Sequence, residues 1–116
     1  MSETKPFTEK RPWGEFRQFT SGVPVTVKTI VVKDGESFSL QRHHMRTEFW
    51  RVLSGTPEVT VGETVTRAQA GDEFTIPVET KHRVKALGGD ALFLEISYGA
   101  FDEHDIVRLE DNYGRA

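Results

Sequence analysis

The 116-residue sequence contains no cysteine, and this absence excludes disulfides, thiolate nucleophiles and cysteine-ligated metal centres. A cysteine-free chain fits the cytoplasm, which we take as the expected location. Long apolar runs are also missing, since no stretch approaches the roughly 20 residues that span a bilayer. The first thirteen residues are mostly polar and lack the apolar core of a signal peptide. We therefore expect no membrane association.

An excess of one charge is missing too. The sequence has 15 Lys and Arg against 18 Asp and Glu, with both signs mixed along the chain, for a formal net charge of −3. Without a basic patch there is no electrostatic case for nucleic acid as a partner. The length suits one packed core and is too short for two ordinary domains. We expect a single domain over residues 1–116 with an N-terminal arm at about residues 1–14.

What the sequence does contain is a series of short runs rich in Val, Thr, Ile and Phe, separated by Gly and Pro. Such runs predict β-strands bounded by turns. No window shows a sustained apolar period of 3.6 residues, so we expect little helix. The candidate strands cover residues 25–32, 38–43, 49–53, 58–61, 65–67, 73–76, 82–86 and 92–98. The sequence therefore predicts an all-β sandwich or barrel, and eight strands suit a jelly roll.

Four side chains could converge on one metal ion. Gln41 and His43 are two residues apart and share one face of a predicted strand. Glu48 follows after a short loop, and His82 shares its strand face with the apolar Val84, which favours an inward position. Two imidazoles, one carboxylate and one amide oxygen suit Zn²⁺, Mn²⁺, Fe²⁺, Co²⁺ or Ni²⁺ better than calcium.

The spacing of these donors resembles the two sequence motifs of the cupin family. The first motif is matched in register by Gly35, Gln41, His43, Glu48 and Gly55, and the second by Gly71, Pro77 and His82. The sequence departs from the motifs with Gln41 for a His, Glu79 for a Gly and Ala86 for an Asn. The resemblance implies a cupin-type double-stranded β-helix, a jelly-roll barrel, with Gln41, His43, Glu48 and His82 as metal ligands.

Three further segments are similar to the type II phosphomannose isomerase domain. They are RPWG at residues 11–14, LQRHHMRTEFW at 40–50 and DIVRLEDNYGR at 105–115. In that family the cupin is often the C-terminal part of a bifunctional mannose-1-phosphate guanylyltransferase and isomerase. The glycine-rich nucleotide loop of the guanylyltransferase half is absent from this sequence, so we do not expect that activity.

The resemblance implies that the chain interconverts mannose 6-phosphate and fructose 6-phosphate with one divalent metal ion, usually zinc. It also implies substrate-site roles for Arg46 and Arg108. Aldose–ketose isomerisation needs an acid/base group and an anchor for the phosphate, for which arginine is suited. The sequence offers four alternatives for the acid/base group: His44, Glu79, Lys81 and Glu48. Of these we take Lys81 as a candidate catalytic residue, together with the two arginines.

One departure from the isomerase family bears on the substrate rather than on the metal. The family commonly has a His between the Glu and the Trp, where this sequence has Phe49. Two other functions therefore stay open: a metal cupin of other chemistry, such as an iron-dependent oxygenase, and a non-catalytic sugar-phosphate-binding cupin. We expect Trp50 to pack near the site, Trp13 to pin the N-terminal arm, and the chain to form a homodimer.

Overall fold

The computed structural model describes residues 5–99, 102 and 104–110. Within these residues the chain forms strands and no helix, and so no helix that could cross a membrane. The all-β prediction is confirmed. The strands are β1 (Phe7–Arg11), β2 (Gly14–Gln18), β3 (Val25–Val32), β4 (Leu40–Arg42), β5 (Arg46–Ser54), β6 (Glu58–Val61), β7 (Thr64–Arg67), β8 (Glu73–Ile76), β9 (His82–Lys85), β10 (Ala91–Gly99) and β11 (Val107–Glu110).

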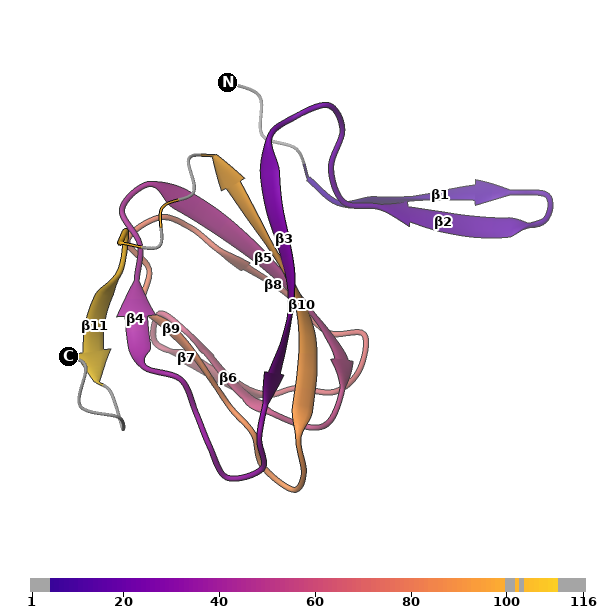
Figure 1. Cartoon of the computed structure of the whole chain (residues 1–116). Coiled ribbons are helices and arrows are strands. Elements are labelled where there is room, and N and C mark those ends of the chain that lie inside the picture. The colour runs from indigo at the N-terminus through magenta and orange to yellow at the C-terminus, as the bar shows by residue number, and fades with distance from the viewer. Residues whose placement is uncertain (1–4, 100–101, 103, 111–116) are drawn as a thin grey trace.

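The strands form two larger sheets and one separate hairpin. One sheet has the order β3-β10-β5-β8 and the other the order β11-β4-β9-β6-β7, and every strand pair is antiparallel. Figure 1 shows the two sheets facing each other around a common interior, while β1 and β2 stand away from the barrel on the side of β3 and β10. Side chains that alternate along each strand therefore point either into this interior or to the outside.

The hydrophobic core fills one part of the interior. Trp50 and Phe93 are its largest members, with ring centroids 5.2 Å apart. The other buried members are Val32, Val52, Val59, Ala68, Ile76, Val84, Ala86 and Ala91. Gly55, which matches the last glycine of the first motif, has φ +87°, and a Cβ there would lie 2.5 Å from the Asp90 carbonyl oxygen. Only glycine fits this turn without displacing the backbone.

The strand predictions hold best where β-branched residues are dense. The bounds of β3, β6 and β8 match the expected ones, whereas β1, β2 and β11 were not expected. The sequences of β1 and β2, FTEKR and GEFRQ, are too polar to show a strand pattern. In its described part, the expected N-terminal arm takes the form of this hairpin. The expectation that Trp13 pins the arm is wrong, because its side chain is 74% exposed.

Candidate metal centre

The four predicted donors come from neighbouring strands at one end of the interior. Gln41 on β4 is the register partner of His82 on β9, and His43 lies one residue beyond the end of β4. Glu48 lies on β5 in the facing sheet. His43, Glu48 and His82 are all buried, and they offer ligand atoms within 4.8 Å of one another. Gln41 lines the same cavity.

Both imidazoles are oriented by main-chain carbonyl groups. The His82 Nδ1–H donates to the Thr80 carbonyl oxygen at 2.9 Å, and the His43 Nδ1–H donates to the carbonyl oxygen of Asp105. Each Nε2 therefore keeps its lone pair and faces Glu48, at 3.3 Å for His43 and 3.7 Å for His82. A hydrogen bond of this kind, from one ring nitrogen to a carbonyl oxygen, fixes the tautomer of a histidine that binds metal through its other ring nitrogen.

The electrostatics of His82 suit a metal ligand. Burial lowers the pKa of His82 below its ordinary value, although the negative charge of Glu48 opposes the shift. The imidazole is therefore neutral at pH 7, as metal binding requires.

Asp105 holds the loop that carries His43. Its carboxylate accepts the backbone N–H groups of His44 and Met45 at 2.8 and 2.9 Å. Burial alone would raise the pKa of Asp105, but these two hydrogen bonds and the charge of Arg46 lower it overall. The same residue thus fixes the backbone of the loop through its side chain and the His43 ring through its carbonyl.

Arg46 and Trp50 are the immediate partners of Glu48. The Arg46 Nε donates to Glu48 Oε2 at 3.0 Å, and its Nη2 lies 3.3 Å from His43 Nε2. The Trp50 Nε1–H donates to Glu48 Oε1 at 3.2 Å and lies 3.3 Å from Glu95 Oε2. The prediction that Trp50 packs near the site is confirmed, and Arg46 lies within the donor cluster itself.

Glu95 is a residue of this cavity that the sequence did not reveal. It lies on β10, buried beside Trp50, and faces the interior. Burial, and then the nearby charge of Glu48, raise its pKa to about 7. The signal that could have found it is the alternation of β10, which places a carboxylate among the inward residues Phe93 and Ser97.

Lys28 and Arg108 also line the cavity, which has a volume of about 250 Å³. Arg108 lies on β11 and is the register partner of Gln41. Its buried Nε finds no hydrogen-bond acceptor among the residues that the structure describes. Buried donors are normally satisfied, so this guanidinium is arranged to meet an acceptor from outside the described chain. Together with Arg46, it makes this end of the barrel suited to an anion.

Three of the residues considered for acid/base chemistry lie outside the cavity lining. The Lys81 amine pairs with Glu63 Oε1 at 2.8 Å, on the outside of the barrel. His44 is half exposed, and its Nδ1 lies 2.8 Å from Glu79 Oε2. Glu79 has φ +63°, so this non-glycine residue keeps the left-handed backbone that the cupin motif assigns to glycine.

The substitution at Phe49 does not reach the cavity. Glu48 and Trp50 on β5 point inward, so Phe49 between them points outward. There it is buried against Phe19, with ring centroids 5.6 Å apart. The departure from the isomerase pattern at this position therefore leaves the lining of the donor cavity unchanged.

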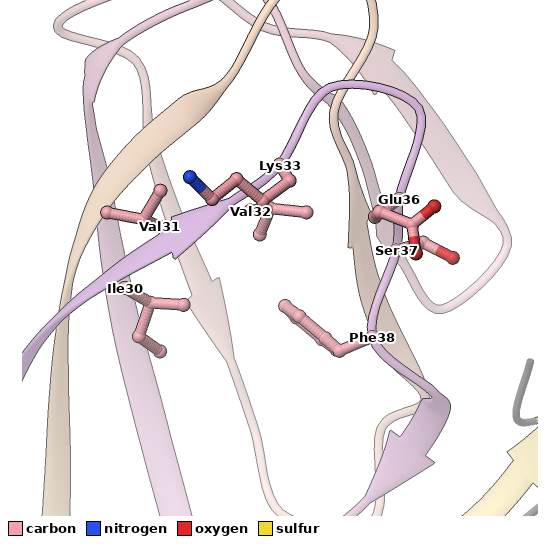
Figure 2. A pocket seen from close by; sticks show the side chains of 7 residues that line it. All are labelled: Ile30, Val31, Val32, Lys33, Glu36, Ser37 and Phe38. Carbon is pink, nitrogen blue, oxygen red and sulfur yellow. The ribbon is translucent and has the colours of Figure 1, made fainter. Parts of the chain in front are cut away.

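A second hollow, of about 330 Å³, lies between β3 and the segment that leads to β4. Figure 2 shows its lining: Ile30 and Phe38 border it with the neighbouring valines, and Lys33 and Glu36 are its charged members. Ile30 and Phe38 also line the donor cavity, so the two hollows share a wall. In the described part of the chain, the group of side chains that could hold a metal ion is His43, Glu48 and His82, which lies in the donor cavity and not in the second hollow.

Comparison with known proteins supports this description. Among solved structures, a cupin protein from Bacteroides fragilis superposes with a TM-score of 0.60 at 24% sequence identity, covering 66% of each chain. The facing antiparallel sheets of this chain thus have the cupin fold.

A family model described as mannose-6-phosphate isomerase C-terminal matches residues 2–111, and the chain belongs to that family. The xanthan biosynthesis protein XanB of Xanthomonas campestris is 45% identical over 107 residues, which cover 90% of this chain and 23% of XanB. The mannose-1-phosphate guanylyltransferase ManC of Salmonella typhimurium is 38% identical over 107 residues, which cover 90% of this chain and 22% of ManC. The chain thus spans less than a quarter of the length of the curated relatives that it matches.

Proposed function

We propose that the chain is a metal-dependent isomerase that interconverts mannose 6-phosphate and fructose 6-phosphate. One observation carries the proposal: three metal-donor side chains share a cavity with the half-buried Arg108, whose buried Nε has no acceptor in the described part of the chain. A cavity with metal donors and a free anion-binding group fits a phosphorylated substrate that reacts at its other end. The family to which the chain belongs supports the same reaction.

The residues fit a divalent ion. His43, Glu48 and His82 supply two nitrogens and one oxygen, and the amide oxygen of Gln41 would complete a four-ligand set. Such a set favours zinc, with manganese, iron, cobalt and nickel as alternatives. A bound ion would act as a Lewis acid that stabilises the oxyanion developed during isomerisation.

Arg46 has to move when the site is filled. The His43 Nε2 lone pair cannot serve both the Arg46 Nη2, now at 3.3 Å, and a metal ion. The same guanidinium would also stand close to a second positive charge at Glu48. Moved away from the donors, Arg46 becomes available to an anionic substrate, as the isomerase resemblance implies.

The isomerisation also needs an acid/base group among the side chains that line the cavity. Of the two carboxylates that line it, Glu48 belongs to the donor set, which leaves Glu95. Glu95 lies beside Trp50 and faces the same space as the donors, so it is placed to exchange a proton with a sugar carbon. We propose Glu95 for this role in place of Lys81, whose amine pairs with Glu63.

The test is a coupled assay for fructose 6-phosphate formed from mannose 6-phosphate. The protein is stripped with a chelator and then reloaded with zinc, manganese or iron. Turnover should return with metal, and Arg108→Ala should raise KM about 10- to 100-fold, as expected for loss of a charge-assisted hydrogen bond, without weakening metal binding. The matched control is Arg83→Ala on β9, whose guanidinium pairs with Glu110.

The outcomes separate the competing functions. Metal binding without turnover would retire mannose 6-phosphate as the substrate. Tight binding of the sugar phosphate without turnover would identify a non-catalytic binding cupin. Oxygen consumption by the iron-loaded protein would favour an oxygenase.

A further inference from the structure

Lys28 is a charged side chain on the inward face of a strand that carries no other charge. The sequence of β3 is VTVKTIVV, and the neighbours of Lys28, Val27 and Thr29, are exposed. Lys28 itself is half-buried and lines the donor cavity together with Ile30, two residues further along the strand. Lysine usually keeps its charge in water, so an inward lysine in an apolar strand needs a physical explanation.

The strand partner of Lys28 is Glu95 on β10. The two residues are directly opposite each other in the β3–β10 ladder (Figure 1), so their side chains start about 5 Å apart on the same, inward face. Burial and the charge of Glu48 raise the pKa of Glu95, and the charge of Lys28 partly opposes them. The amine therefore lies within electrostatic reach of the carboxyl group that we propose for proton transfer at carbon.

The interconversion of an aldose and a ketose moves two protons. One passes between the carbons C2 and C1, and the other passes between the oxygens on the same two carbons. A single carboxyl group placed at the carbons serves the first movement. The second movement needs a group that can both give and take a proton.

Among the described residues that line the cavity, Lys28 is the cation suited to this second movement. The other two cations are Arg46 and Arg108, and a guanidinium does not lose its proton in proteins. His43 and His82 donate their Nδ1–H groups to main-chain carbonyls and turn Nε2 toward the donor cluster. A lysine amine, by contrast, changes its protonation readily and can act as an acid and as a base.

We propose that Lys28 is a second catalytic residue, which moves the proton between the two oxygens while Glu95 moves the proton between the two carbons. From mannose 6-phosphate, Glu95 takes the proton from C2 and the Lys28 ammonium gives one to the C1 carbonyl oxygen. The C1=C2 double bond forms as the C1=O double bond opens, which gives an enediol. The Lys28 amine then takes the proton of the C2 hydroxyl, the C2=O double bond forms, and Glu95 returns its proton to C1. Both residues end in their starting protonation states.

The inference rests on the proposed isomerase activity, so its first test compares turnover with ligand binding in Lys28→Ala. Removal of an acid/base group should lower kcat about 100- to 10,000-fold. Calorimetric affinity for mannitol 6-phosphate, which has no carbonyl group and cannot react, should stay close to the wild-type value, as should the affinity for zinc. The matched control is Lys85→Ala on β9, which removes an exposed lysine and should keep the wild-type kcat.

The second test supplies the missing amine from solution. Methylammonium added to Lys28→Ala should raise kcat about 10-fold or more and reach saturation, because it has a proton to give. Tetramethylammonium has the same charge and no such proton, and it should have no effect. If Lys28→Ala does not fold, Lys28→Met keeps most of the length of the side chain and gives the same comparison of kcat with mannitol 6-phosphate binding.

The outcomes separate this inference from the proposed function. If the wild type turns over and Lys28→Ala keeps its kcat, the role of Lys28 is overturned and the isomerase proposal stands. Weaker mannitol 6-phosphate binding with an unchanged kcat would make Lys28 a phosphate anchor, and rescue by tetramethylammonium would reduce its role to that of a fixed charge. Aggregation of Lys28→Ala at the wild-type kcat would mean that the lysine only protects the edge strand β3 from pairing. A metal-loaded wild type without turnover would overturn both proposals.

Discussion

The donor cluster and the β1–β2 hairpin have nearly opposite surroundings. The donor cluster is dense in hydrogen bonds and ion pairs, and Glu48 alone meets Arg46 and Trp50 from its own strand and His43 from beyond the end of β4. Among the residues that the structure describes, the hairpin is held at its base, where Arg17 binds Glu73. Burial and hydrogen bonds fix the direction of the groups in the cluster, whereas the hairpin leaves its aromatic groups available. The first arrangement suits chemistry at one point, and the second suits docking to a surface.

The largest expected effect is on zinc affinity, which should fall when the donor cluster is changed and stay the same when the hairpin is changed. His82→Ala removes a donor nitrogen, and it should weaken zinc binding at least about 100-fold, more than the loss of a residue that only orients a donor does. Trp13→Ser should leave zinc affinity unchanged, because no donor contacts the hairpin. Calorimetric titration of zinc into the stripped proteins measures both values. Weakened zinc binding in Trp13→Ser would show that the two regions are coupled.

A second prediction compares the pH dependence of the stability of the metal-free protein after removal of one carboxylate from each region, Glu95 in the donor cavity and Glu15 on the hairpin. The raised pKa of Glu95, about 7, means that the folded state holds a proton that the unfolded state releases near pH 4.5. Stability is therefore lost as pH rises from about 4.5 to 7, and burying the charge costs up to about 3 kcal/mol above that window. Glu95→Gln should be more stable than wild type at pH 8 by up to about that amount, and similar to it at pH 4.5.

Urea unfolding of both proteins across this pH range measures the difference. Glu15→Gln on the hairpin is the control, since its exposed carboxylate pairs only with Lys10, and it should show no comparable pH-dependent gain. If the free energy of unfolding of Glu95→Gln had the same pH dependence as that of the wild type, the raised pKa of Glu95 would be contradicted.

The smallest expected effect is on the stability of the loop beside the donor cluster. Glu79 has φ +63°, which costs about 1 kcal/mol of folding free energy relative to glycine. Two effects oppose this gain from glycine: the Glu79 carboxylate contacts His44, and glycine would increase the conformational entropy of the unfolded chain. Glu79→Gly should therefore change the free energy of unfolding by less than about 1 kcal/mol. Glu79→Ala keeps the strained backbone and loses the contact, so it should be less stable than Glu79→Gly in the same denaturation experiment.

The sequence was informative where residue type and spacing act together. The glycine and histidine spacing led to the fold and to the three donors that the structure brings together, because a strand alternates its faces and the cupin turns need glycine. Glu95 was missed because the sequence does not show whether a single glutamate in an apolar strand is buried or exposed. Lys81 is next to the donor His82 in the sequence, but adjacent residues of an extended strand point to opposite faces, so this position does not bring its amine into the cavity. The zinc, the homodimer, the roles of Arg46 and Arg108, and the cytoplasmic location stay predictions.

The main-chain hydrogen bonds to His43 and His82 also bear on how this site tolerates sequence change. Thr80 and Asp105 orient the two rings through carbonyl oxygens, which every amino acid carries. Random substitution at position 80 therefore keeps the His82 tautomer so long as the path of the loop is kept. At position 105 the carboxylate shapes the loop, whereas the atom that contacts His43 is again a main-chain carbonyl oxygen. Substitution at position 80 should thus leave the direction of the His82 ring unchanged.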